Sequence, residues 1–153
     1  MSKYKQGVFK PQNPEKWILA KTSITQGNVI RYMSSYELKC FKFLDTHPSI
    51  IKVSSEPFAI PYLSPKDDKI HRYYPDLIVK NKDGTIFLVE IKPHSQTIPP
   101  KIPKTNRKSS LERYARELET YNINIAKWQS AVKFCNEKNI KFLILTEKHL
   151  NIK

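Results

Sequence analysis

Two strand-like runs decide the fold: IHRYYPDLIV (Ile70–Val79) and TIFLVEIK (Thr85–Lys92). Asp83-Gly84 lies between them, and Asp-Gly between β-branched and aromatic runs is a strong hairpin signal. The second run is apolar on both faces before its charged residues, which is typical of a central strand buried on both sides. Pro75 in the first run predicts an edge, a bulge or a break there.

The hairpin predicts a cluster of charged side chains at one end of a sheet. Folding the chain at the turn brings Asp76 opposite Val89 or Glu90, and directly opposed residues lie roughly 5 Å apart. Because strand side chains alternate, Glu90 and Lys92 share one face. Two such carboxylates suit Mg²⁺, which takes one or two protein carboxylates and leaves positions for water and phosphate. Lys92 would then orient an attacking water or neutralise charge on the phosphate. A surface hairpin with incidental charges is the alternative.

A third acid comes from the segment Ser34–Asp45, which reads as a helix. Ser34 is a good N-cap and Glu37 stands three residues later, so the two form a capping box. Glu37 also lies within the apolar arc of the helical wheel, which faces the core. We therefore interpret Glu37 as a third acid of the metal site, with helix capping alone as the alternative.

Composition points to a polyanionic partner. The chain has 153 residues, enough for one domain with a real core, and its 27 Lys and Arg against 14 Asp and Glu give a net charge of +13. A charge of this size favours nucleic acid. No segment approaches the apolar length of a transmembrane helix, so no membrane association is expected. The two cysteines lack metal-ligand spacing and are expected to be buried and reduced.

Two segments are rich in cations. Residues 1–30 are interpreted as an extended basic arm for DNA-backbone contact or protein docking, with a solvated tail as the alternative for residues 1–10. Residues 93–110 hold four prolines and no acid, so no helix runs through most of the segment. We interpret this loop as a clamp on the DNA backbone, with a solvated connector as the alternative. Its candidate phosphate contacts are Lys101, Lys104, Arg107 and Lys108.

The remaining segments complete an α/β pattern. An apolar stripe from Leu111 to Cys135 predicts one helix, or two with a break near Asn122-Ile123-Asn124. Core packing is the preferred interpretation of the stripe, and a homodimer seam is the alternative. Short strands are expected at Ile50–Val53 and Pro57–Tyr62, and a final buried strand at Lys141–Thr146.

The order of helix, strands, acidic hairpin, helix and strand resembles the restriction-endonuclease-like, PD-(D/E)XK nuclease fold. The signature is Pro75-Asp76 followed by Glu90-Ile91-Lys92, with Glu37 on the preceding helix. This resemblance implies a central mixed β-sheet flanked by helices. It divides the chain into a basic arm, residues 1–30, and a nuclease domain, residues 31–153.

The resemblance extends to the head-completion nucleases of large tailed phages, relatives of the end-cleaving subunit of heteromeric transposases. It covers nearly the whole chain, through motifs such as Arg72-Tyr73-Tyr74-Pro75-Asp76 and Val89-Glu90-Ile91-Lys92-Pro93. It implies that Glu37, Asp76 and Glu90 bind Mg²⁺, that Mn²⁺ can substitute, and that Lys92 is catalytic.

One position departs from the family pattern. The family often carries Arg directly before the Ser pair, where this chain has Met33, with Arg31 two residues earlier. Arg31 is therefore the candidate replacement for that phosphate contact. Arg72, beside the Pro-Asp motif, is a further candidate contact with DNA.

The predicted function is a metal-dependent DNA endonuclease with little sequence specificity. The resemblance implies a role in finishing DNA-filled phage heads in the host cytoplasm, with head, portal or neck proteins as partners and retention in the virion as an option. Two alternatives stand beside it. One is a non-catalytic virion plug that binds DNA on a nuclease fold, and the other is a sequence-specific endonuclease of the restriction or transposition type.

Overall fold

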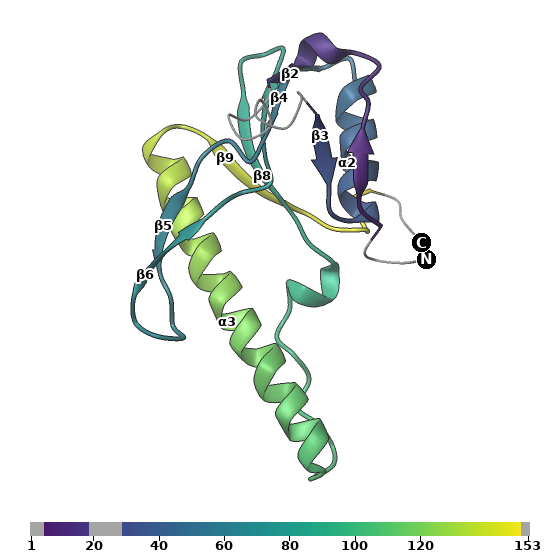
Figure 1. Ribbon diagram of the computed structural model, residues 1–153. Coiled ribbons are helices and arrows are strands. Elements are labelled where there is room, and N and C mark those ends of the chain that lie inside the picture. The colour runs from purple at the N-terminus through teal and green to yellow at the C-terminus, as the bar shows by residue number, and fades with distance from the viewer. Residues whose placement is uncertain (1–4, 19–28, 151–153) are drawn as a thin grey trace.

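The centre of the fold is a five-stranded mixed sheet, in a computed structural model that describes residues 5–18 and 29–150 (Figure 1). The three central strands are antiparallel, and each edge strand runs parallel to its neighbour. In order across the sheet they are β2 (Trp17–Ile18), β4 (Ile50–Ser55), β7 (Leu77–Asn81), β8 (Ile86–Ile91) and β9 (Lys141–Leu145).

The predicted hairpin is the β7–β8 pair. Leu77 lies opposite Val89, and the Asn81 N–H donates to the Thr85 carbonyl at 2.9 Å. Gly84 closes the turn with a φ of +87°, a conformation that costs glycine little. Strand β8 lies between β7 and β9 and is buried from Leu88 onward, so the predicted central strand is confirmed.

The run Ile70–Val79 forms two strands, so the predicted irregularity at Pro75 is confirmed as a break. It breaks after β6 (Ile70–Tyr73), because Pro75 has no N–H for a sheet ladder. Strand β6 pairs instead with β5 (Ile60–Leu63) in a separate two-stranded sheet. The expected strand Pro57–Tyr62 is thus β5, displaced toward its C-terminal end.

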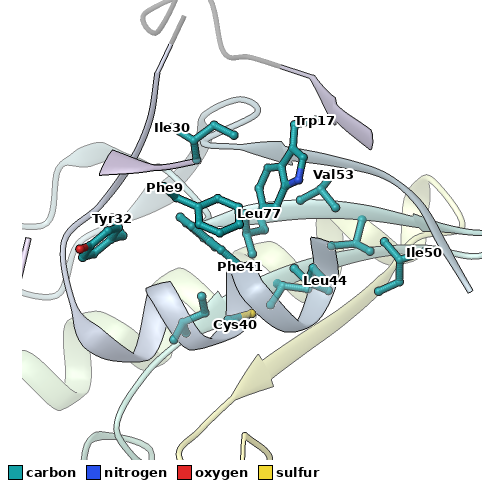
Figure 2. Close-up of a cluster of buried hydrophobic side chains, with 13 residues drawn as sticks. Phe9, Trp17, Ile30, Tyr32, Cys40, Phe41, Leu44, Ile50, Val53 and Leu77 are labelled. Carbon is teal, nitrogen blue, oxygen red and sulfur yellow. The ribbon is translucent and has the colours of Figure 1, made fainter. Parts of the chain in front are cut away.

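Helix α2 (Ser35–Thr46) covers one face of the main sheet with an aromatic core (Figure 2). The Phe9, Trp17 and Phe41 rings pack against one another with centroids 5.3 to 5.8 Å apart. The first two belong to the predicted basic arm, so its described part shares the core of the chain that follows. The arm supplies β1 (Gly7–Phe9), η1 (Pro14–Lys16) and β2, and β1 pairs with β3 (Ile30–Tyr32).

Helix α3 (Lys108–Glu137) covers the opposite face and is unbroken, which settles the alternative of two helices. No Gly or Pro interrupts it, and its end is set by Asn139 at a φ of +56°. The apolar stripe is only partly core, since Trp128 and Cys135 are buried while Leu111 and Val132 are exposed. The first half of α3 extends beyond the sheet, beside the loop that carries η2 (His94–Gln96) (Figure 1).

Two further expectations concern the strand at the C-terminal end and the membrane. Strand β9 was expected to be buried, but it is a half-exposed edge strand, because among the described residues only β8 pairs with it. In the described part of the chain, no helix combines the length and apolarity that a membrane crossing requires.

Candidate active site

The β7–β8 hairpin brings the two predicted acids together at one end of the sheet. Asp76 directly precedes β7, and its Oδ2 accepts the Ile91 N–H at 2.7 Å. Glu90 lies in β8 and is buried, with 4% of its surface exposed. Lys92 directly follows the strand, and its Nζ lies 3.4 Å from Glu90 Oε1. The turn and the strand register therefore place these groups as the sequence predicted.

All three groups belong to the face of the sheet that α3 covers. Val89 and Ile91 pack into the α2 core, whereas Leu88 and Ile78 pack with α3. Alternation places Glu90 and Lys92 on the same face as Leu88, and Asp76 on the same face as Ile78. Glu90 therefore lies on the side of the sheet where α3 and the β5–β6 hairpin meet, whereas the charge of Asp76 also reaches Cys40 of α2.

Glu37 reaches the site from the N-terminus of α2. Its N–H donates to Ser34 Oγ at 3.1 Å, and its Oε2 accepts the Met33 N–H at 2.6 Å. The capping role is therefore confirmed. The Glu37 carboxylate accepts from the N–H of Met33, whereas in a standard capping box it would accept from the N–H of the N-cap residue, Ser34. The same carboxylate is close enough to Glu90 and Lys92 to feel their charges.

Burial and neighbouring carboxylates raise the pKa values of Asp76 and Glu37. Burial raises the pKa of Asp76 well above its usual range, and repulsion from Glu90 and Glu37 raises it further, against the lowering effects of the Ile91 N–H and Lys92. Burial also raises the pKa of Glu37. The pKa of the Cys40 thiol rises to about 12, through burial and then the charges of Asp76 and Glu37. The site thus concentrates negative charge that its protein partners only partly compensate.

The donor set suits a hard divalent cation. Carboxylate oxygens are the ligands that Mg²⁺ prefers, and a cation would relieve the repulsion that raises the pKa of Asp76. Within residues 5–18 and 29–150, no three His, Cys, Asp or Glu side chains stand as a ready-made metal cluster. The assignment of Glu37, Asp76 and Glu90 as metal ligands stays a prediction.

Tyr73 and Lys127 also belong to the site, although neither was predicted as a site residue. The Tyr73 hydroxyl donates to Glu90 Oε2 at 2.6 Å, and burial is the largest effect raising the pKa of this phenol. Lys127 comes from α3 and interacts electrostatically with Lys92 and Glu90. The sequence signal for Lys127 was its position between Ala126 and Trp128, where a charged residue lies beside the apolar stripe of the helix.

The six predicted DNA-binding cations are exposed and lie on three parts of the fold. Arg31 is on β3, opposite Val8, and Arg72 is on β6, opposite Pro61. The other four lie on the loop and first residue of α3, at the tip that extends beyond the sheet (Figure 1). They are Lys101, Lys104, Arg107 and Lys108, the last of which lies 3.9 Å from Glu112. The structure therefore does not gather the six cations at one point.

A mixed sheet between two helices, with acids and a lysine at the end of a central hairpin, is the arrangement of a restriction-endonuclease-like protein. The family described as TnsA-like endonuclease N terminal matches residues 47–147, which include Asp76, Glu90 and Lys92. The chain belongs to this family.

A phage protein is similar over most of its length. The head completion nuclease of Enterobacteria phage T4 is 36% identical over 137 residues, which cover 88% of this chain and 91% of that protein. This similarity extends well beyond the family match. The two findings confirm the predicted resemblance to head-completion nucleases and to the transposase nuclease subunit.

Proposed function

We propose that this chain is a divalent-metal-dependent DNA endonuclease with little sequence specificity, acting in phage head completion. The observation that carries the proposal is the convergence of Asp76, Glu90 and Lys92 on one face at the end of the β7–β8 hairpin. A module that only bound DNA would gain nothing from carboxylates that repel phosphate. The family and the phage relative support hydrolysis as the activity and the head as its setting.

Each side chain has a role in this proposal. Glu37, Asp76 and Glu90 would hold Mg²⁺, or Mn²⁺ in its place. The ion would polarise the phosphate and lower the pKa of water. Lys92 would bind a phosphate oxygen or orient the water, and its contact with Glu90 fixes its ammonium at the site. Tyr73 keeps Glu90 in place through its hydroxyl.

Four cations near the tip of α3 would bind the DNA backbone without reading its sequence. They are Lys101, Lys104, Arg107 and Lys108.

The proposed setting follows from the phage relative. The enzyme would trim or hold the DNA end before the tail joins, in the cytoplasm of the infected host. Head, portal or neck proteins are the proposed partners. Because Leu111 and Val132 leave part of the α3 stripe exposed, sedimentation of the purified chain would test the homodimer alternative.

A plasmid assay tests the proposal. Supercoiled plasmid is incubated with the wild type, Lys92→Ala and Lys80→Ala, in Mg²⁺, in Mn²⁺ and in EDTA. Lys80 is a matched control, since it is an exposed lysine in β7 toward the hairpin turn. We expect metal-dependent nicking by the wild type and Lys80→Ala, lost in Lys92→Ala.

Other results would favour the alternatives. Salt-sensitive DNA binding without cleavage in either metal would favour a virion plug. A fixed set of fragments from unrelated plasmids would favour a sequence-specific enzyme. Cleavage that Lys92→Ala retains in full would remove Lys92 from the mechanism.

A further inference from the structure

Lys127 is held in a defined position where α3 meets the β5–β6 hairpin. Its Nζ lies 5.8 Å from the ring centroid of Tyr62 and 5.9 Å from that of Tyr73. Ring faces attract an ammonium group, so two tyrosines from different strands hold this cation. Lys127 is also half-buried, unlike the exposed cations of the loop.

This position is connected to the active site. Tyr73, one of the two rings near Lys127, donates its hydroxyl to Glu90 Oε2 at 2.6 Å. Lys127 interacts with Lys92 by repulsion and with Glu90 by attraction, and its pKa is lowered by burial first and by Lys92 second. Lys127 and Lys92 therefore approach the site from α3 and from β8.

The two lysines differ in their acid partners. Glu90 Oε1 lies 3.4 Å from Lys92, whereas Lys127 forms no ion pair with an acid among the described residues. In the proposed enzyme the three acids hold the metal, so the half-buried Lys127, without an ion pair in the described part of the chain, gains from binding an anion of the substrate. An anion with several oxygens would satisfy both ammonium groups, and a phosphodiester is the anion that the chain's charge of +13 favours.

We propose that Lys127 and Lys92 together bind one phosphodiester of the DNA strand at the active site. Lys127 is then a substrate-binding residue supplied by α3, in addition to the acids and lysine of the hairpin. The inference rests on the proposed function, since it takes DNA to be the substrate. The loop cations would hold the duplex at a distance, whereas this pair would fix the strand where it is cleaved.

A binding assay without cleavage tests this site. Affinity for a fluorescent duplex is measured by anisotropy over a range of salt, in EDTA, with every protein carrying Asp76→Asn. Lys127→Met keeps the apolar stem and removes the charge, and Lys127→Arg keeps the charge. Lys133→Met is the matched control, an exposed lysine farther along the same helix.

We expect Lys127→Met to bind about tenfold more weakly and the slope of log affinity against log salt to become shallower by about one. Lys127→Arg and Lys133→Met should stay within about twofold of the parent. If both lysines bind one phosphate, Lys92→Met with Lys127→Met should lose less than the product of the single losses. Circular dichroism checks folding, and Lys127→Gln replaces a Met variant that melts.

Three outcomes would overturn the inference: parental affinity and slope in Lys127→Met, equal losses in Lys127→Met and Lys133→Met, or independent effects of the two site lysines. The assay requires no turnover, so its failure differs from failure of the nuclease proposal. A wild type that binds DNA but never cleaves it would contradict the nuclease alone.

Discussion

Asp45 and Asp76 are two aspartates with different neighbours. Hydrogen-bond donors surround Asp45, whereas other carboxylates lie near Asp76. Asp45, at the end of α2, is 2% exposed and is surrounded by donors. Its carboxylate accepts the Gln12 N–H at 2.7 Å and the Asn13 N–H and Trp17 Nε1 at 3.1 Å each. These bonds attach the start of the chain to α2, and they make Asp45 a structural anchor.

Asp76 is partly exposed and accepts the Ile91 N–H at 2.7 Å. Its other neighbours include Glu90 and Glu37, and burial with this repulsion raises its pKa. Burial of a carboxylate therefore does not by itself identify a functional site. Surrounding donors indicate a structural role, whereas facing carboxylates indicate a position prepared for a cation.

The largest predicted effect is on the cleavage rate, which should depend on Asp76 and not on Asp45. Asp76→Asn should lower the cleavage rate by on the order of 10³-fold, because the charge that would hold the metal is removed. Asp45→Ala should retain the wild-type rate per folded molecule. Plasmid nicking rates, corrected for the folded fraction by circular dichroism, provide the comparison. Equal loss in both variants would contradict the distinction.

The second predicted effect is on stability, where Asp45 should matter more than Asp76. Asp45→Ala leaves the Gln12 and Asn13 N–H groups and the Trp17 indole without their acceptor. We expect the free energy of unfolding to fall by about 3 kcal/mol. Urea denaturation followed by Trp fluorescence measures this loss. A loss of about 1 kcal/mol or less, the net value of one ordinary hydrogen bond, would show that the anchor is less important than its geometry indicates.

The third effect is the pH dependence of stability without metal. The raised pKa of Asp76 means that the folded state keeps this proton to higher pH than the unfolded state. The associated stability is present below the unfolded pKa, about 4, and is lost as pH rises through the folded pKa. Asparagine does not ionise, so Asp76→Asn should be more stable than the wild type at about pH 8, and not at about pH 4.

Addition of Mg²⁺ provides a second test of the charge on Asp76. At about pH 8, Mg²⁺ should stabilise the wild type, because a bound cation offsets the repulsion among the acids, and should have little effect on Asp76→Asn. Thermal melts with and without Mg²⁺ give both comparisons. An equal shift in the two proteins would indicate binding of Mg²⁺ elsewhere.

The smallest effect compares one hydrogen bond in each region. Tyr73→Phe removes the hydroxyl that donates to Glu90, and we expect cleavage to slow by about tenfold, equivalent to about 1.4 kcal/mol. Trp17→Phe removes the indole N–H that donates to Asp45, and should reduce stability by about 1 kcal/mol with no change in cleavage rate. A Tyr73→Phe enzyme as fast as the wild type would show that Glu90 needs no support from Tyr73.

The hairpin and its charged end could be predicted from the order of the residues. The Asp83-Gly84 turn sets the register of β7 against β8, and alternation then places Glu90 and Lys92 on one face. Ser34 and Glu37 likewise define the start of α2. These features depend on turn geometry and on side-chain period, which act between close neighbours or across one tight turn, so they can be read from the residues in order.

Two other members of the site depend on how separate elements pack. Tyr73 and Lys127 lie near Glu90 because β6 and α3 pack around the end of the sheet. Glu37, which the helical wheel predicted to face the core, joins them from α2. The attachment of Trp17 to Asp45 joins positions 28 residues apart in the chain. No local period encodes such meetings, because the packing of apolar faces sets how separate elements are placed against one another. The sequence therefore specified the chemistry of the hairpin, whereas the packing of the two helices and the β5–β6 hairpin decided which other side chains join it.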